Sequence, residues 1–114
     1  MKVIIAGSRE INNYPLVEKY CNYYTKNYEN IIVVSGTCRG ADTLGEQWAK
    51  SKGYPVVRFL PNWNLGKKAG PLRNKEMAEF SDALILFWDG KSKGSADMLR
   101  QAKEHNLLIR EVRI

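Results

Sequence analysis

Apolar residues along the chain gather in five short runs, and between these runs apolar positions recur at helical spacing. The runs are rich in valine, isoleucine and leucine and are bounded by glycine, proline or polar residues, a pattern typical of buried strands. Where a run is apolar throughout, it indicates a parallel strand that is covered on both faces. We expect strands at Lys2 to Ala6, Ile31 to Val34, Pro55 to Phe59, Ala83 to Phe87 and Leu107 to Val112.

The segments between the strands carry the signals of helix starts and helix ends. Pro15 suits the first turn of one helix, and Gly53 is a natural stop for the next. Pro71 favours the first position of a third helix, where its missing N–H costs little. Either Ser92 or Ser95 is suited to cap a fourth helix. Strands and helices therefore alternate along the whole chain.

This alternation predicts an α/β protein with a Rossmann-like three-layer sandwich. We expect a five-stranded, mainly parallel sheet with helices on both faces. The 114 residues have room for one hydrophobic core, so residues 1–114 are expected to form a single domain. The polar segment Pro61 to Lys68 is predicted to be a loop that is long enough to cover a site.

The chain has a formal net charge of +6, and this balance favours anionic partners such as nucleotides or nucleic acid. A basic, solvated surface explains the same charge equally well, and composition does not separate the two interpretations. No apolar run has the length of a membrane span, and the start of the chain lacks the pattern of a signal peptide. We therefore expect a cytoplasmic protein with no membrane partner.

The residues that usually carry nucleophilic or metal chemistry are sparse. Cys21 and Cys38 show no metal-like spacing and are expected to be reduced thiols. The single histidine, His105, falls at the far end of the fourth helix, away from the carboxyl ends of the strands. A Cys/His or Ser/His nucleophile system is therefore not expected. Neither a metal nor a cofactor is predicted.

The stretch from Ser35 to Asp42 follows the second strand and leads into the second helix. A strand, a glycine loop and a helix start build a site for an anion, because glycines allow close approach and the first helical N–H groups are unpaired. Arg39 adds a planar guanidinium group that suits phosphate or carboxylate. Two interpretations stay open for Arg39 and Asp42, which either contact the ligand or pair with each other. The candidate ligand residues here are Ser35, Gly36, Thr37, Arg39, Gly40 and Asp42.

The loops that follow parallel strands emerge at one edge of the sheet and are expected to surround one crevice. Arg9 and Lys67 contribute to a basic rim, and Asp89 offers an acceptor for ribose hydroxyl groups. Trp63 and Trp88 either stack on a base or pack as ordinary structural residues. The candidate ligand residues from these loops are Gly7, Ser8, Arg9, Trp88, Asp89, Gly94 and Ser95.

Two motifs of the chain are familiar. Ile5 to Arg9, together with Val34 to Asp42, resembles the Gly-Ser-Arg turn and the Ser-Gly-x-x-Arg-Gly-x-Asp loop of the DNA-processing protein DprA. Arg73 to Ile85 is similar to the Arg-Lys-x-x-Met helix and following strand of the Lonely Guy (LOG) nucleotide phosphoribohydrolases. The chain therefore resembles the SMF/DprA–LOG (SLOG) superfamily, and within it the small single-domain members related to YspA and YpsA.

The resemblance to the LOG enzymes implies roles for several residues. Arg73 stands where those enzymes have a catalytic arginine, and Gly94 with Ser95 fits the Gly-Thr of their phosphate loop. Their catalytic glutamate corresponds to Met98, and Asp97 lies one position earlier. Arg73 and Asp97 are therefore the candidate catalytic residues, and cleavage of an N-glycosidic bond stays open.

These observations lead to one hypothesis and two alternatives. The leading hypothesis is a pocket for a nucleotide or nucleotide-derived ligand, such as a nucleoside phosphate or an ADP-ribose-like molecule. The protein would act as a sensor, a sequestering protein or a phosphoribohydrolase-like enzyme. The first alternative is a single-stranded nucleic-acid-binding module that resembles DprA. The second is a homo-oligomer that associates through the tyrosines of the first helix.

Overall fold

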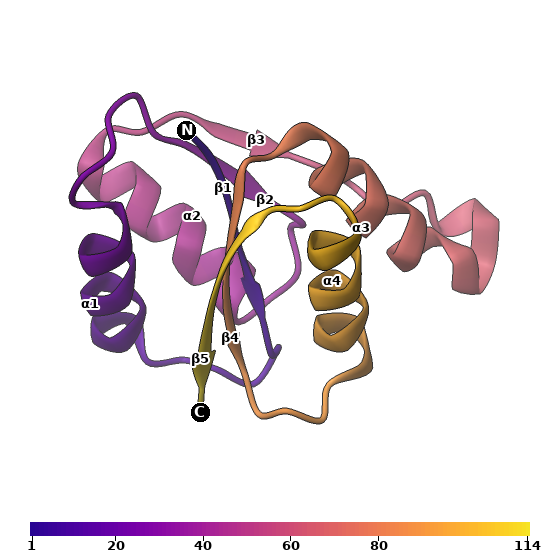
Figure 1. Cartoon of the computed structure of the whole chain (residues 1–114). Helices are drawn as coiled ribbons and strands as arrows, with labels where there is room; N and C mark the ends of the chain where they lie inside the picture. The colour runs from indigo at the N-terminus through magenta and orange to yellow at the C-terminus, as the bar shows by residue number, and fades with distance from the viewer.

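The computed structural model describes residues 1–114, which form one sheet between two layers of helices (Figure 1). The strands are β1 (Lys2–Gly7), β2 (Ile32–Ser35), β3 (Val56–Arg58), β4 (Ala83–Trp88) and β5 (Leu108–Arg113). The helices are α1 (Tyr14–Thr25), α2 (Ala41–Lys52), α3 (Ala69–Phe80) and α4 (Lys93–Glu104), with a 3-10 helix, η1, at Trp63–Lys68. The strand order is β3-β2-β1-β4-β5, and every neighbouring pair is parallel. The predicted α/β sandwich is confirmed, with a sheet that is parallel throughout.

Alternation along the strands divides the core into two halves. In β1, Val3 and Ile5 belong to the cluster that packs under α1 and α2, whereas Ile4 and Ala6 belong to the cluster under α3 and α4. The two helical layers lie on opposite sides of the sheet in Figure 1. All six residues of β4 are buried, as expected for a strand with helices on both faces. The central strands β1 and β4 therefore form the rigid middle of the molecule.

The segment before α3 differs from the prediction. Residues 61–68 were expected to be a loop, but Trp63–Lys68 forms η1, whose two turns meet at Gly66 with φ 65°. The Asn62 side chain starts η1 by accepting a hydrogen bond from the Asn64 N–H at 3.2 Å. Because η1 leads directly into α3 at Ala69, Pro71 occupies the third helical position instead of the first.

The region after β4 also differs from the prediction. Trp88 was expected in a loop, but it is the last residue of β4, because β5 pairs with β4 as far as Arg113. The loop is consequently short, and α4 begins at Lys93. Ser92 is the N-cap of α4, with its hydroxyl accepting the Ser95 N–H at 3.4 Å.

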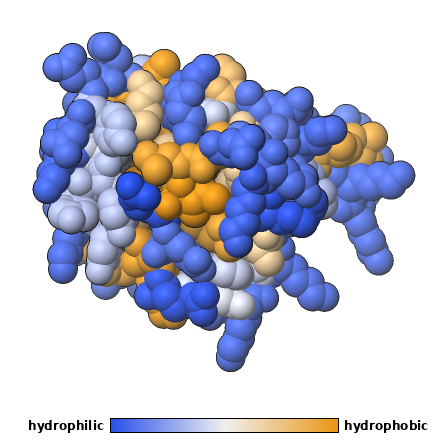
Figure 2. Space-filling view, viewed as in Figure 1, coloured by the Kyte–Doolittle hydropathy of each residue, from blue (hydrophilic) through white to orange (hydrophobic).

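Figure 2 shows a largely hydrophilic surface with apolar residues over β5, the edge strand between α1 and α4. Further apolar residues lie on the protrusion that carries η1, where Leu60 and Leu65 are exposed. No helix combines the length and the hydrophobicity that crossing a membrane requires.

Gly45 allows α2 to lie close against Ile5 of β1. A Cβ atom at this position would lie 2.6 Å from Ile5 Cγ2 and 2.7 Å from Ile5 Cβ. We expect Gly45→Ala to lower the free energy of unfolding by about 1–3 kcal/mol, because the helix must move off β1. Urea denaturation measures this change.

Gly94→Ala is the matched control, because a Cβ atom on this helical glycine would meet nothing within 4 Å. That substitution is expected to leave stability unchanged or to raise it by up to about 1 kcal/mol. Equal effects of the two substitutions would contradict the packing argument at Gly45.

Candidate functional site

A crevice of about 370 Å³ opens at the carboxyl edge of the sheet. It lies where β1 and β4 end, at the point where the strand order reverses and the two following loops diverge. Its lining comes from the end of β1 and the loop after it, the loop before α2 and the first turn of α2, the start of η1, one side of α3, and the N-cap and first turns of α4. The fold thus gathers distant parts of the sequence around one hollow.

Arg73 of α3 is half-buried in this crevice and is held by neutral groups. Its Nη1 donates to the Gly36 carbonyl, and its Nε donates to Asn74 Oδ1 at 3.0 Å. Nη2 lies 3.9 Å from the Cys38 sulfur atom. No carboxylate lies within 4.0 Å of the guanidinium group. Its positive charge is therefore oriented by the protein without being paired.

Most of the other arginines have an ionic partner. Of seven arginines in the chain, four form ion pairs with a glutamate or an aspartate at 2.6–3.1 Å. Arg9, Arg73 and Arg110 do not. Arg9 and Arg73 both line the crevice, so two unpaired guanidinium groups converge on the same hollow. This distribution of charge favours an anion there.

Asn74 connects Arg73 to α4. Its side chain is 5 % exposed, and Nδ2 donates to Asp97 Oδ2 at 2.9 Å. The other oxygen of Asp97 accepts from Arg100 Nη2 at 2.6 Å. Both carboxylate oxygens of Asp97 are therefore engaged. Sequence reasoning missed Asn74, and a polar amide on the apolar side of a helix, next to an arginine, was the available signal.

Asp42 is the most deeply buried acid of the crevice, with 5 % of its surface exposed. Its Oδ2 accepts the Cys38 N–H at 3.2 Å. Burial raises the pKa of Asp42 from 3.8 to about 6, although the Cys38 N–H and the charge of Arg73 oppose the change. The carboxyl group thus titrates near neutral pH within reach of an arginine. A buried, perturbed acid in a crevice is typical of functional sites.

The first turn of α4 presents unpaired donors to the crevice. The backbone N–H groups of Lys93 and Gly94 have no partner in the chain, as is usual before the fourth residue of a helix. Ser95 is 4 % exposed, and its Oγ has no hydrogen-bond partner. All three residues line the crevice. They form a second group of donors that suits an anion.

The glycine loop between β2 and α2 contributes less to the crevice than the sequence suggested. Of the stretch from Ser35 to Asp42, only Cys38 in the loop and Asp42 in the first turn of α2 line it. The Ser35 hydroxyl donates to Glu46 of α2 at 2.6 Å and accepts the Thr37 N–H at 3.1 Å. The Ser35 hydroxyl and the Thr37 N–H are therefore already engaged within the protein. A Cβ atom on Gly36 would lie 2.8 Å from Asp42 Oδ2 and 2.9 Å from Arg73 Nη1, so the loop and the charged groups are closely packed.

Two further positions of the loop are also used for structure. Arg39 pairs with Glu10 at 2.9 Å on the surface, so the pairing with Asp42 that the sequence left open does not form. Gly40 has a φ of 82° and lies against the backbone of Ser8 and Arg9, where a side chain would collide with the Ser8 carbonyl oxygen. These contacts fix the loop beside the end of β1.

The remaining candidates divide between the crevice and the core. Gly7 lines the crevice at the end of β1, and the neighbouring Ser8 N–H donates to the Phe87 carbonyl at 2.9 Å. Trp88 is buried and donates its indole N–H to Glu111 at 2.5 Å, so it is not available to stack on a ligand. Asp89 accepts the N–H groups of Lys91 and Ser92 and closes the turn before α4. Gly7 therefore lines the crevice, whereas Trp88 and Asp89 do not.

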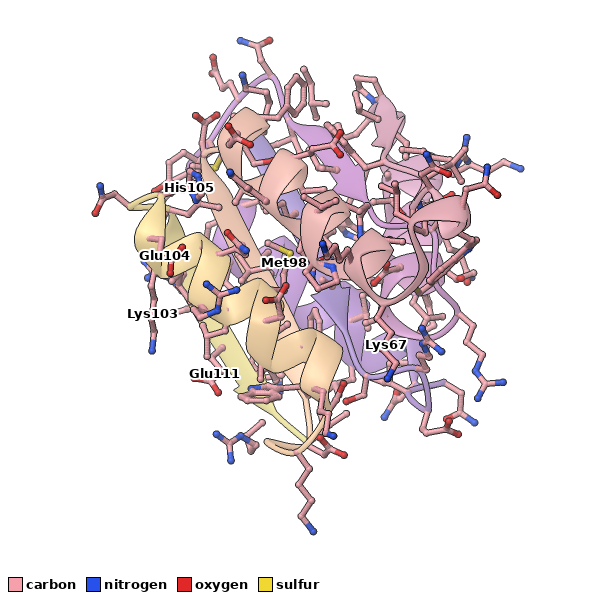
Figure 3. All side chains as sticks on the ribbon, turned by 90° about the vertical axis from the view of Figure 1, so that its right-hand side faces the viewer. Lys67, Met98, Lys103, Glu104, His105 and Glu111 are labelled. Atoms are coloured by element: carbon pink, nitrogen blue, oxygen red, sulfur yellow. The ribbon has the colours of Figure 1, made fainter.

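Met77 and Met98 give the crevice an apolar part, and both side chains are 2 % exposed. Figure 3 shows Met98 on α4, and it shows His105 at the end of this helix that points away from η1 and Lys67. No three side chains of histidine, cysteine, aspartate or glutamate lie close enough to hold a metal ion. The crevice thus combines apolar contacts from two methionines with two groups of donors that suit an anion.

Comparisons with known proteins agree with this architecture. The YspA, cpYpsA-related SLOG family matches residues 1–66. The Gene 61 protein of Mycobacterium phage D29 is 32 % identical over 95 % of this chain and 93 % of its own length. The crystal structure of DNA processing protein A (DprA) from Streptococcus pneumoniae has a TM-score of 0.78 and 20 % identity over 96 % of this chain. The match covers 49 % of that DprA chain, so this chain spans about half of it.

The raised pKa of Asp42 leads to a test of the site's electrostatics. The unfolded chain ionises this carboxyl near 3.8 and the folded chain near 6, so stability falls as the pH rises through this window. The total loss is about 3 kcal/mol. Asp42→Asn keeps an acceptor for the Cys38 N–H and should raise the free energy of unfolding at pH 8 by about 1–3 kcal/mol.

Urea denaturation at pH 4 and pH 8 checks this expectation. At pH 4 the two proteins should differ little, because Asp42 is then largely protonated in the folded state. A variant that is less stable than the natural chain at pH 8 would show that attraction to Arg73 outweighs the cost of burial.

Proposed function

The chain belongs to the YspA, cpYpsA-related SLOG family, and we propose that it binds a nucleotide or nucleotide-derived ligand in the crevice. The observation that carries this proposal is the pair of unpaired guanidinium groups, Arg9 and Arg73, which line the same hollow. The phosphate would be bound by these groups and by the free N–H groups at the start of α4. Orienting Arg73 through neutral acceptors keeps its charge available for this purpose.

The size and polarity of the crevice support a nucleoside phosphate as the class of ligand. A volume of about 370 Å³ lies at the lower end of the range for small-molecule sites. Met77 and Met98 offer apolar contacts, and Asn74 and Ser95 offer polar ones. An ADP-ribose-like molecule would extend beyond this volume onto the open side. The proposal therefore covers nucleoside phosphates first and larger derivatives second.

We propose binding, as a sensor or a sequestering protein, rather than cleavage. Met98 occupies the position of the glutamate that LOG enzymes use, and both oxygens of Asp97 already accept hydrogen bonds. Breaking an N-glycosidic bond needs a carboxylate that stabilises the transition state or activates water. Chromatography of a ligand incubated with the protein tests this proposal. An unchanged ligand supports binding without cleavage, whereas release of the base would show phosphoribohydrolase activity instead.

Binding of single-stranded nucleic acid is the second candidate function. None of the eleven lysines forms an ion pair, and Lys67 and Lys93 lie on the segments that border the crevice. The solved structure with a similar fold is titled a DNA processing protein. A positively charged groove with an exposed aromatic side chain suits a single strand. The two candidates differ in the number of phosphates bound and therefore in their response to salt.

Thermal unfolding with and without ligands tests both functions. The panel holds the four common nucleoside monophosphates, ADP-ribose and a single-stranded oligonucleotide, each at low and high salt. A ligand present at about a hundredfold its dissociation constant adds roughly 2.7 kcal/mol of stability, which raises the melting temperature by several degrees. A nucleotide that raises it at both salt concentrations would support the crevice. An oligonucleotide that acts only at low salt would support the second candidate.

Substitutions of two arginines separate the crevice from the general basic surface. Arg73→Ala should weaken nucleotide binding by about 10–100-fold, because a charge-assisted hydrogen bond is lost. Arg39→Ala is the matched control and should leave binding unchanged, because Arg39 pairs with Glu10 outside the crevice. Arg73→Lys keeps the charge and should lose less than Arg73→Ala. Equal binding by the natural chain and both Arg73 variants would place the phosphate elsewhere.

A further inference from the structure

We infer that Trp63 is the residue that recognises the base of the ligand, by stacking on it at the mouth of the crevice. This inference rests on the proposed function and adds to it a requirement for a planar, aromatic group beside the phosphate. It also assigns a role to η1, which projects beyond the α3 layer on the right-hand side of Figure 1.

The three tryptophans of the chain have very different surroundings. Trp48 is fully buried and donates its indole N–H to Asn22 at 2.9 Å. Trp88 is buried, and the guanidinium carbon of Arg113 lies 5.2 Å from its ring centre. Trp63 is 65 % exposed, forms no aromatic pair and has no partner for its indole N–H. Of the three indole rings, that of Trp63 is therefore the one open to contact with another molecule.

An exposed tryptophan ring offers apolar area that a bound molecule can cover. A large aromatic side chain gains stability from burial in proportion to its apolar area, and Trp63 forgoes most of this gain. Trp63 is also the one aromatic residue that lines the crevice. A planar base placed there would cover the ring without any change in the core.

The backbone holds Trp63 in a defined position. Asn62 caps η1 through the Asn64 N–H, and its carbonyl accepts the Leu65 N–H at 3.0 Å. Trp63 is the first residue of this capped turn, and η1 continues directly into α3, which carries Arg73. The cap thus fixes the turn that carries Trp63, and the kink at Gly66 separates this turn from the one that leads into α3. Such preorganisation reduces the entropy that binding costs.

Stacking on Trp63 predicts an order of affinity among ligands. Every base has a π face, so the contact favours nucleotides over sugar phosphates without selecting one base. At least one of the four nucleoside 5′-monophosphates should bind about tenfold or more tightly than ribose 5-phosphate. Inorganic phosphate, which reaches only the charged groups, should bind no more tightly than ribose 5-phosphate.

Titration calorimetry of these probes with variants of Trp63 tests the inference. Trp63→Leu should remove the preference for nucleotides over ribose 5-phosphate, and Trp63→Phe should keep part of it. Leu65→Ala is the matched control, because Leu65 is 49 % exposed on the same 3-10 helix but does not line the crevice. It should leave both affinities unchanged. Bound nucleotide should also protect the fluorescence of Trp63 from acrylamide, since the other two tryptophans are buried.

The possible failures are distinct. If ribose 5-phosphate and phosphate bind but nucleotides gain nothing, or if Trp63→Leu keeps the full preference, the inference is wrong and the proposed function stands. If none of the probes binds the natural chain, the proposed function fails and the inference fails with it. If Leu65→Ala removes the preference for nucleotides as strongly as Trp63→Leu does, the preference depends on the shape of η1 and not on the indole ring, and the inference is wrong.

Discussion

The parallel pairing of β1 with β2 on one side and β4 on the other is the constraint on which the rest of the molecule depends. Because β1 lies in the middle, the chain must cross to the other half of the sheet after β3, and the loops after β1 and β4 part from one another. The crevice follows from this divergence. The first half of the chain supplies Arg9 and Asp42, and the second supplies Arg73 and the start of α4. Neither half contains the whole site.

Neutral groups hold the charged centre of the crevice. Arg73 is positioned by the carbonyl of Gly36 and the amide of Asn74, so α3 and the loop after β2 are joined without cancelling a charge. Asp42 is the only acid that is deeply buried beside it, and its raised pKa shows that this burial is costly. Retaining an acid at such a cost is consistent with a functional role, since sites of activity are often less stable than they would otherwise be.

Local patterns predicted the fold well, because strand runs and helix caps depend on neighbouring residues. Gly53 ends α2 with a φ of 75°, as the sequence indicated, and Ser92, one of the two serines that the sequence offered, caps α4. The site depends on contacts between distant segments, and here prediction was weaker. The sequence offered both Arg39 and Arg73 as candidate ligand residues and did not show that Glu10 pairs with Arg39 and leaves Arg73 unpaired. Trp88 and Trp63 were likewise equivalent until the register of β5 placed Trp88 in the core.

The most direct test of this account is a titration of the ¹⁵N-labelled protein with a nucleoside monophosphate, followed by two-dimensional NMR. We expect the largest shifts at the backbone N–H groups of Lys93 and Gly94 and at the Nη2 group of Arg73, which has only the Cys38 sulfur atom beside it, because these donors should receive the phosphate. The indole N–H of Trp63 should shift as well if the base stacks on its ring. Shifts confined to the surface around Arg39, or spread evenly over the exposed lysines, would contradict a single phosphate site in the crevice.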